Sequence, residues 1–194
     1  GAALEYGVDR AAVVRAVRGF RPLAHRLELV AEAAGVRYID DSKATNPHAT
    51  LAAVKGLGDV VLIAGGRSKG IDLKVLAATV PPVRSVIVLG EAADELGRVF
   101  GPLVPVHRAD SMDRAVQVAA AQAVDGGSVL LSPGCASLDM YESYAQRGEA
   151  FAAAVRMMLR SEHAEDSVDG DAGRSRPDRK TDAGRSRPDR GTDA

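Results

Sequence analysis

The stretch VVLIAGG at residues 60–66 indicates the fold class. Every residue before the glycine pair is apolar, so a strand here would be buried on both of its faces. Strands of this kind are typical of a parallel sheet that is covered by helices on both sides. The runs SVIVLG at 85–90 and SVLLSP at 128–133 have the same character and predict two further strands of that sheet.

Helical segments are expected between and after these strands. They are predicted at 47–57, 73–80, 91–100, 111–123 and 138–160. A weaker strand is expected near residues 104–107. This alternation predicts a doubly wound, Rossmann-like α/β domain with a mostly parallel sheet.

Two further elements are expected before the first of those helices. Asp9 is suited to cap a helix that ends near Arg18, with Val13, Val14 and Val17 on its apolar side. Residues 26–40, RLELVAEAAGVRYID, predict two strands around a turn at Ala34–Gly35, which would form a β-hairpin.

The last 34 residues differ in composition from the rest of the chain. From Ser161 onward Val168 is the only large apolar residue, and DAGRSRPDR occurs at 171–179 and again at 182–190. Such a segment buries too little apolar area to offset the entropy lost on ordering. The sequence therefore predicts one domain over residues 1–160 and a disordered repeat tail over 161–194.

The overall composition narrows the classes of partner and compartment. The formal net charge is −1 among 194 residues, which gives no reason to expect nucleic acid or a membrane surface as partner. No apolar run has the length of a membrane span. The single cysteine, Cys135, excludes an intrachain disulfide and suits a reducing cytoplasm.

Candidate binding groups follow the predicted strands. DDSKATN, GGRSKG and SPGCAS combine small residues with hydroxyls and cations, and loops at the carboxyl ends of parallel strands meet at one edge of the sheet. Lys43 and Lys69 offer charge, Gly65 and Gly66 allow close approach, and three hydroxyls offer hydrogen bonds, from Thr45, Ser68 and Ser137. A ligand with two carboxylates would fit this set of donors.

Each of these features also has a structural explanation. Loop lysines are mostly solvated, a glycine pair is often only a turn, and Ser42, Thr45 or Asn46 could simply cap the following helix. The chain has neither a GxxxxGK[ST] nor a GxGxxG motif, and its four histidines lack metal-ligand spacing, so no metal site is expected. Cys135 is expected to be a small buried residue rather than a nucleophile. By itself the sequence predicts half of a binding site.

Four segments carry a resemblance to a known family. LAHRLELV, GVRYIDDSKATNP, LIAGGRSKG and LLSPGCASLDMYESYAQRGEAF resemble, in order and spacing, the C-terminal domain of the D-glutamate-adding ligases of the Mur ligase family. The resemblance covers roughly residues 1–160. It implies an ATP-dependent ligase of peptidoglycan precursor synthesis, which joins D-glutamate to UDP-N-acetylmuramoyl-L-alanine through an acyl phosphate.

The same resemblance assigns roles to residues of this sequence. The D-glutamate pocket would be lined by Lys43, Thr45, Lys69, Ser137, Leu138 and Tyr144. His25, Arg26 and Asp41 would face the nucleotide, and Lys43 and His25 are the expected catalytic pair. Tyr144 departs from the phenylalanine expected at its position.

The family's other two domains are not expected within these 194 residues. The resemblance implies that Mg²⁺ would be held mainly by the central ATPase domain, and that the chain alone would be inactive. A monomer is expected. The alternative from a different class is a free-standing α/β module that binds an acidic amino acid or a protein partner.

Overall fold

The computed structural model describes residues 5–19 and 23–172, and for 162–172 it describes the backbone alone. The chain divides into two compact units, Gly1–Arg160 and Ser161–Ala194. The last helix runs to Ala172, so residues 161–172, which were expected to lack structure, are helical. The remainder of the predicted tail, 173–194, lies outside the described residues.

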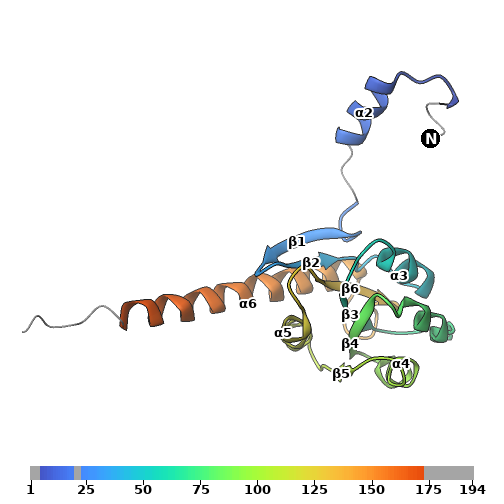
Figure 1. Ribbon diagram of the computed structural model, residues 1–194. Coiled ribbons are helices and arrows are strands. Elements are labelled where there is room, and N and C mark those ends of the chain that lie inside the picture. The colour runs from blue at the N-terminus through green and yellow to red at the C-terminus, as the bar shows by residue number, and fades with distance from the viewer. Residues whose placement is uncertain (1–4, 20–22, 173–194) are drawn as a thin grey trace, which may run out of the picture. The chain divides into compact units, whose positions relative to one another are not determined.

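A six-stranded sheet forms the centre of the first unit (Figure 1). Its strands are β1 (Glu28–Ala33), β2 (Val36–Asp40), β3 (Val60–Gly65), β4 (Val83–Leu89), β5 (Val106–Arg108) and β6 (Ser128–Gly134). They lie in the order β1-β2-β6-β3-β4-β5, with β1 antiparallel to β2 and every other neighbouring pair parallel. The predicted mostly parallel sheet with an N-terminal hairpin is therefore confirmed.

Helices connect the strands as the sequence predicts. The α-helices are α2 (Arg10–Gly19), α3 (Pro47–Val54), α4 (Ala93–Phe100), α5 (Met112–Gln122) and α6 (Tyr144–Ala172). The segment Leu73–Thr79 is a 3₁₀-helix, η1, rather than an α-helix. Asn46 caps α3 by accepting a hydrogen bond from Ala49 N at 3.0 Å, and Pro47 stands in its first turn, where no N–H is needed.

The core lies on both faces of the sheet. Every residue of β3 is buried, and successive side chains point to opposite faces. Val60 and Leu62 pack in one apolar cluster, which includes residues of α3, η1 and α4. Val61 and Ile63 pack in the other, which includes residues of α5 and α6. Burying each such side chain contributes about 1.5–3 kcal/mol, which explains why these strands are apolar throughout.

Helix α6 begins six residues later than expected. The sequence analysis extended it from residue 138, but residues 138–143 form a loop and the first helical residue is Tyr144. Ser143 Oγ accepts a hydrogen bond from Gln146 N at 3.1 Å, while the Gln146 side chain accepts one from Glu142 N at 2.7 Å. This variant of the capping box, S-x-x-Q, sets the start of the helix and was a readable but missed signal.

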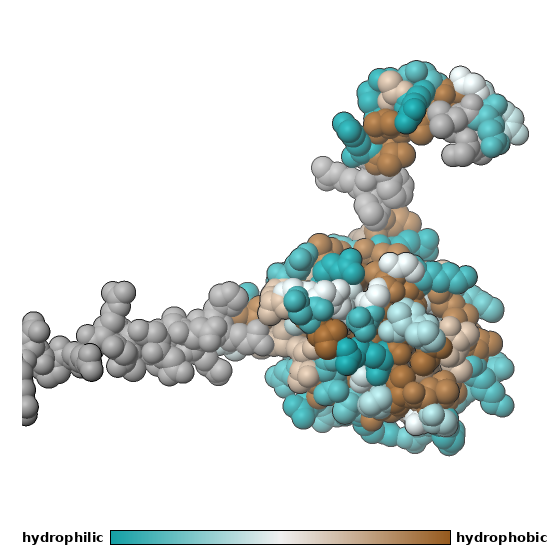
Figure 2. All heavy atoms as spheres, viewed as in Figure 1, coloured by the Kyte–Doolittle hydropathy of each residue, from teal (hydrophilic) through white to brown (hydrophobic). Residues whose placement is uncertain are grey.

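Helix α2 is described by itself. Asp9 caps it through a 3.0 Å hydrogen bond from Ala12 N, as expected. None of its side chains is buried, and Val14 and Val17 are exposed. Figure 2 shows hydrophobic residues gathered on part of this helix. Within the described ranges, no helix combines the length and apolar character that a membrane crossing requires.

Candidate functional site

The loop after β2, residues 41–46, is held tightly at the carboxyl edge of the sheet. Asp41 N donates to Leu131 O of β6 at 2.8 Å, and Gly134 N donates to Ala44 O at 3.0 Å. Asp41 and Ser42 are both buried, although both are polar. Hydrogen bonds to the neighbouring strand therefore fix the backbone of this loop before any ligand arrives.

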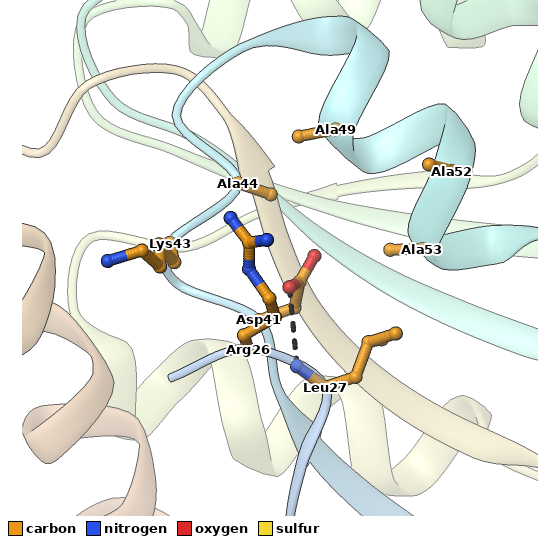
Figure 3. A pocket seen from close by; sticks show the side chains of 8 residues that line it. All are labelled: Arg26, Leu27, Asp41, Lys43, Ala44, Ala49, Ala52 and Ala53. Atoms are coloured by element: carbon orange, nitrogen blue, oxygen red, sulfur yellow. Dashed lines mark hydrogen bonds between the residues drawn. The ribbon is translucent and has the colours of Figure 1, made fainter. Parts of the chain in front are cut away.

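A pocket of about 270 Å³ opens beside this loop (Figure 3). Its walls are formed by Arg26, Leu27, Asp41, Lys43, Ala44, Ala49, Ala52 and Ala53. In Figure 3 the side chains of Arg26 and Asp41 point toward the alanines of α3, whereas the Lys43 ammonium points away from them. One wall is thus apolar and the other carries charge of both signs, which suits a ligand with a flat apolar part and polar substituents.

Asp41 is the buried charge of this pocket. Its carboxylate accepts hydrogen bonds from Ser132 Oγ at 2.8 Å and from Leu27 N at 3.3 Å. Burial raises the pKa of Asp41 above its ordinary value, while the Ser132 and Leu27 hydrogen bonds and the charge of Arg26 act in the opposite direction. These donors hold the carboxylate in a defined orientation at the pocket wall.

Lys43 connects the pocket to the start of α6. Its Nζ donates a 2.9 Å hydrogen bond to the Tyr144 hydroxyl and lies 4.5 Å from the centre of the Tyr144 ring. Ser42 Oγ in turn donates to Tyr144 O at 2.7 Å. The fold therefore brings together two of the predicted D-glutamate residues that lie 101 positions apart in the sequence.

His25 lies next to this pair but does not line the pocket. Its Nδ1 is 2.7 Å from Asp40 Oδ2, and its ring meets the Tyr144 ring edge-on at 6.2 Å between centroids. Gly148 of α6 lies directly against His25 and Asp40, because a Cβ there would approach His25 Nδ1 to 2.3 Å and Asp40 Oδ2 to 2.5 Å. Only glycine lets the helix pack this close.

The remaining predicted site residues lie on two adjoining loops. Lys69 is exposed on the loop after β3, and Ser137 is buried and Leu138 exposed on the loop after β6. A two-way backbone bridge joins the two loops, since Arg67 N donates to Ala136 O and Ala136 N donates to Arg67 O. Thr45 is half-buried in the loop after β2. None of these four residues lines the pocket of Arg26 and Asp41.

Arg147 was not singled out by sequence analysis, yet it holds three of these loops together. The side chain is 2% exposed and donates to Ser42 Oγ at 3.0 Å, Ser42 O at 2.9 Å, Cys135 O at 3.1 Å and Gly65 O at 3.4 Å. Burial lowers the pKa of Arg147 to about 10. Arg147 lies four residues after the capping serine, and nothing in its local sequence indicates that its partners lie at the ends of β2, β3 and β6.

Cys135 is confirmed as a buried residue. It is 1% exposed, and burial raises the pKa of its thiol to about 12. A thiol in that state is a poor nucleophile at neutral pH. Its carbonyl, rather than its sulfur, takes part in the site, as an acceptor for Arg147.

Comparison with known proteins shows the family to which this chain belongs. The family model described as "Mur ligase, glutamate ligase domain" matches residues 25–135. The chain is 50% identical over 154 residues to a UDP-N-acetylmuramoylalanine–D-glutamate ligase of Frankia casuarinae, covering 77% of this chain and 33% of the relative. A ligase of the same name from Nitrosococcus oceani is 45% identical over 157 residues, covering 79% and 35%. The chain thus spans about a third of the length of the curated relatives it matches.

Solved structures show the same fold at low sequence identity. UDP-N-acetylmuramate-alanine ligase MurC of Thermotoga maritima superimposes with a TM-score of 0.54 at 16% identity, over 80% of this chain and 35% of that one. The bifunctional folylpolyglutamate synthase/dihydrofolate synthase of Yersinia pestis gives 0.53 at 21% identity, over 78% and 36%. Because the family model covers more than half of its residues, the chain belongs to the Mur ligase family and carries its glutamate ligase domain.

Proposed function

We propose that this chain is the amino-acid-binding, C-terminal part of an ATP-dependent ligase that joins D-glutamate to UDP-N-acetylmuramoyl-L-alanine. The relatives that carry this activity in their names are 42–50% identical to the chain. Because the chain spans about a third of their length, the complete reaction requires groups that these residues do not contribute. We expect no turnover by the chain alone.

The single observation that carries the proposal is the position of Lys43. Lys43 contributes to the wall of the pocket of Arg26 and Asp41, while its ammonium donates a hydrogen bond to the Tyr144 hydroxyl at the start of α6. In a reaction through an acyl phosphate, the incoming amine must lie beside the phosphorylated carboxylate. A cation between a nucleotide pocket and an amino-acid pocket can hold the amino acid at that distance.

The residues of this chain would bind and orient the substrates. Lys43 would pair with a carboxylate of D-glutamate, and Lys69 would reach the second one, because burying either without a partner is costly. The hydroxyls of Thr45 and Ser137 and the backbone at Leu138 would complete this pocket. Tyr144 would position Lys43.

The pocket of Arg26 and Asp41 suits one end of a nucleotide. Its apolar α3 wall can contact a base, the Asp41 carboxylate can accept hydrogen bonds from a sugar, and Arg26 can pair with phosphate. At about 270 Å³ the pocket encloses only part of such a molecule, so a second domain would supply the other wall. ATP, when bound, would provide the phosphoryl group that activates the carboxylate.

Mg²⁺ is not assigned to this chain. Among the described residues, His25, Glu28 and Asp40 have ligand atoms within 4.8 Å of one another. These atoms already have protein partners, because Asp40 accepts from His25 and Ser42 N, and Glu28 accepts from His25 N. Mg²⁺ prefers oxygen ligands with several waters, so we propose that the ATP phosphates and a central domain outside these residues hold it. A monomer in the cytoplasm remains our expectation.

Ligand titration tests this proposal directly. In the ¹⁵N-labelled chain, D-glutamate should shift the backbone signals of Lys43, Thr45 and Ser137 in a saturable way, and L-glutamate should shift them less. ATP should shift Leu27, Asp41 and Ala44 instead. The exposed residue Arg156 on α6 should respond to neither ligand. If D-glutamate gives no saturable response, or L-glutamate an equal one, the proposal is overturned.

A further inference from the structure

The hydrogen bond between Lys43 and Tyr144 leaves one donor unused. A phenol can accept hydrogen bonds and can also donate its own hydrogen. Here the Tyr144 oxygen accepts from Lys43 Nζ at 2.9 Å. Among residues 5–19 and 23–161 and the backbone of 162–172, no acceptor is found for the Tyr144 hydroxyl hydrogen. That hydrogen is therefore available to a ligand.

The neighbouring ammonium makes this hydroxyl a stronger donor. A hydrogen bond received from a cation polarises the O–H bond, so the hydroxyl hydrogen becomes more positive. Lys43 has three N–H hydrogens, and Tyr144 occupies one of them. The pair therefore presents hydrogen-bond donors from two adjacent atoms, 2.9 Å apart.

The fold holds the tyrosine in place on two sides. Its backbone oxygen accepts the 2.7 Å hydrogen bond from Ser42 Oγ, and its ring lies edge-on to His25. Ser42 is itself bound by the buried Arg147. The hydroxyl thus stands at a defined position at the start of α6, and it is not a freely rotating surface group.

From this geometry we infer that the Tyr144 hydroxyl is a specificity-determining group that donates a hydrogen bond to the same ligand carboxylate as Lys43. Two adjacent donors match the two oxygens of a carboxylate. They do not match a carboxamide, whose NH₂ group would face another donor. This role rests on the proposed function, because it takes D-glutamate as the ligand. Beyond that function, it makes Tyr144 and Lys43 select a carboxylate over a carboxamide at one end of the ligand. A phenylalanine at this position could not make this contact.

The experiment compares Tyr144→Phe with Tyr141→Phe in the full 194-residue chain. Each substitution removes one hydroxyl from a half-buried tyrosine of the same segment, but Tyr141 packs against the apolar core, whereas the Lys43 ammonium donates to Tyr144. Dissociation constants are measured by NMR titration for three ligands. D-glutamate has two carboxylates, D-glutamine has an amide in place of the γ-carboxylate, and D-isoglutamine has an amide in place of the α-carboxylate. Thermal unfolding of both variants checks that the fold is retained.

Tyr144→Phe should weaken D-glutamate binding by about tenfold, the usual effect of one hydrogen bond to a charged group. The amide ligand that still carries a carboxylate at the end bound by Lys43 and Tyr144 should lose about the same factor as D-glutamate. The amide ligand that carries its carboxamide at that end should bind nearly as before. Tyr141→Phe should change all three constants by less than about twofold. Equal losses for all three ligands would show that the hydroxyl acts only through the fold, and unchanged binding would remove it from the site. Either result overturns the inference while leaving the proposed function in place. Failure of the unsubstituted chain to bind D-glutamate would overturn both.

Discussion

The loops after β2 and β3 each carry a lysine that is expected to meet the same ligand, but the two lysines differ in burial and in hydrogen bonding. In the loop after β2, Lys43 is half-buried and its ammonium is bound to Tyr144. In the loop after β3, Lys69 is exposed and has a positive φ of 54°. Its ammonium has no hydrogen bond or ion pair within the described part of the chain. The fold thus preorganises one lysine, whereas a ligand would have to order the other.

The difference originates in what lies beneath each loop. Ser42 is buried and receives two hydrogen bonds from Arg147, to its hydroxyl and its carbonyl. The loop after β3 is fixed at its base by backbone hydrogen bonds of Gly66 and Arg67, and Lys69, Gly70 and Ile71 beyond it are all exposed. A buried arginine under one loop and solvent around the other therefore decide which lysine is rigid.

Arg147→Ala should have the largest effect of the substitutions considered, because it removes the side chain that holds the loop after β2 in place. The substitution leaves the carbonyls of Ser42, Cys135 and Gly65 without their donor and creates a cavity beneath the loop after β2. We expect a loss of roughly 3–5 kcal/mol in the free energy of unfolding, measured by urea denaturation. Arg156→Ala, at an exposed position on the same helix, is the control and should cost less than about 1 kcal/mol. Similar losses for both variants would show that the hydrogen bonds of Arg147 to the three loops do not stabilise the domain.

Lys43→Ala should have the next largest effect, measured in a complete ligase in which this domain replaces the matching third of a full-length relative. Removing one partner of a buried charge pair costs about 2–5 kcal/mol, which corresponds to a loss of roughly 30-fold to several thousand-fold in kcat/KM for D-glutamate. Steady-state kinetics with varied D-glutamate measures this loss.

The control for Lys43 is His48→Ala. His48 is exposed in the first turn of α3, so this variant should change kcat/KM by less than about threefold. Equal losses at both positions would mean that the segment matters only for folding, and near-normal activity of Lys43→Ala would remove the lysine from the site.

Two glycines show that the base and the outer part of the loop after β3 are constrained to different degrees. At Gly66, φ is +118° and a Cβ would lie 2.2 Å from Ala136 O, whereas at Gly70, φ is +77° and the space is open. Gly66→Ala should therefore destabilise the domain by roughly 2–3 kcal/mol, and Gly70→Ala by about 1 kcal/mol. Differential scanning calorimetry of the two variants measures both. If Gly70→Ala proved as costly as Gly66→Ala, the outer part of this loop would be as constrained as its base.

Removal of residues 161–194 should have the smallest effect. Their composition offers little apolar surface, because Val168 is the only large apolar residue among them. We expect truncation after Arg160 to change the free energy of unfolding by less than about 1 kcal/mol and to leave the NMR signals of Lys43 and Ser42 unshifted. A larger loss would show that this segment contributes to the stability of the domain.

Short-range patterns of the sequence determined the elements of this fold. Continuous apolar runs predicted the buried strands, and the Ala34–Gly35 turn predicted the hairpin. The helix expected from residue 47 does begin at Pro47, and its cap is Asn46, one of the three candidates that the sequence offered. The capping serine of α6 was equally local and could have been read. These features are recoverable because periodicity, capping and turn formation depend on residues within a few positions of one another.

Only the tertiary structure decided which of the candidate side chains meet. The sheet order β2-β6-β3 places the loops after these three strands side by side, although they lie near residues 41, 135 and 65. Arg147 binds all three loops, and Lys43 meets Tyr144 across 101 positions. No local pattern carries this information, because such contacts depend on strand order and helix packing, which are settled by burial of the whole core.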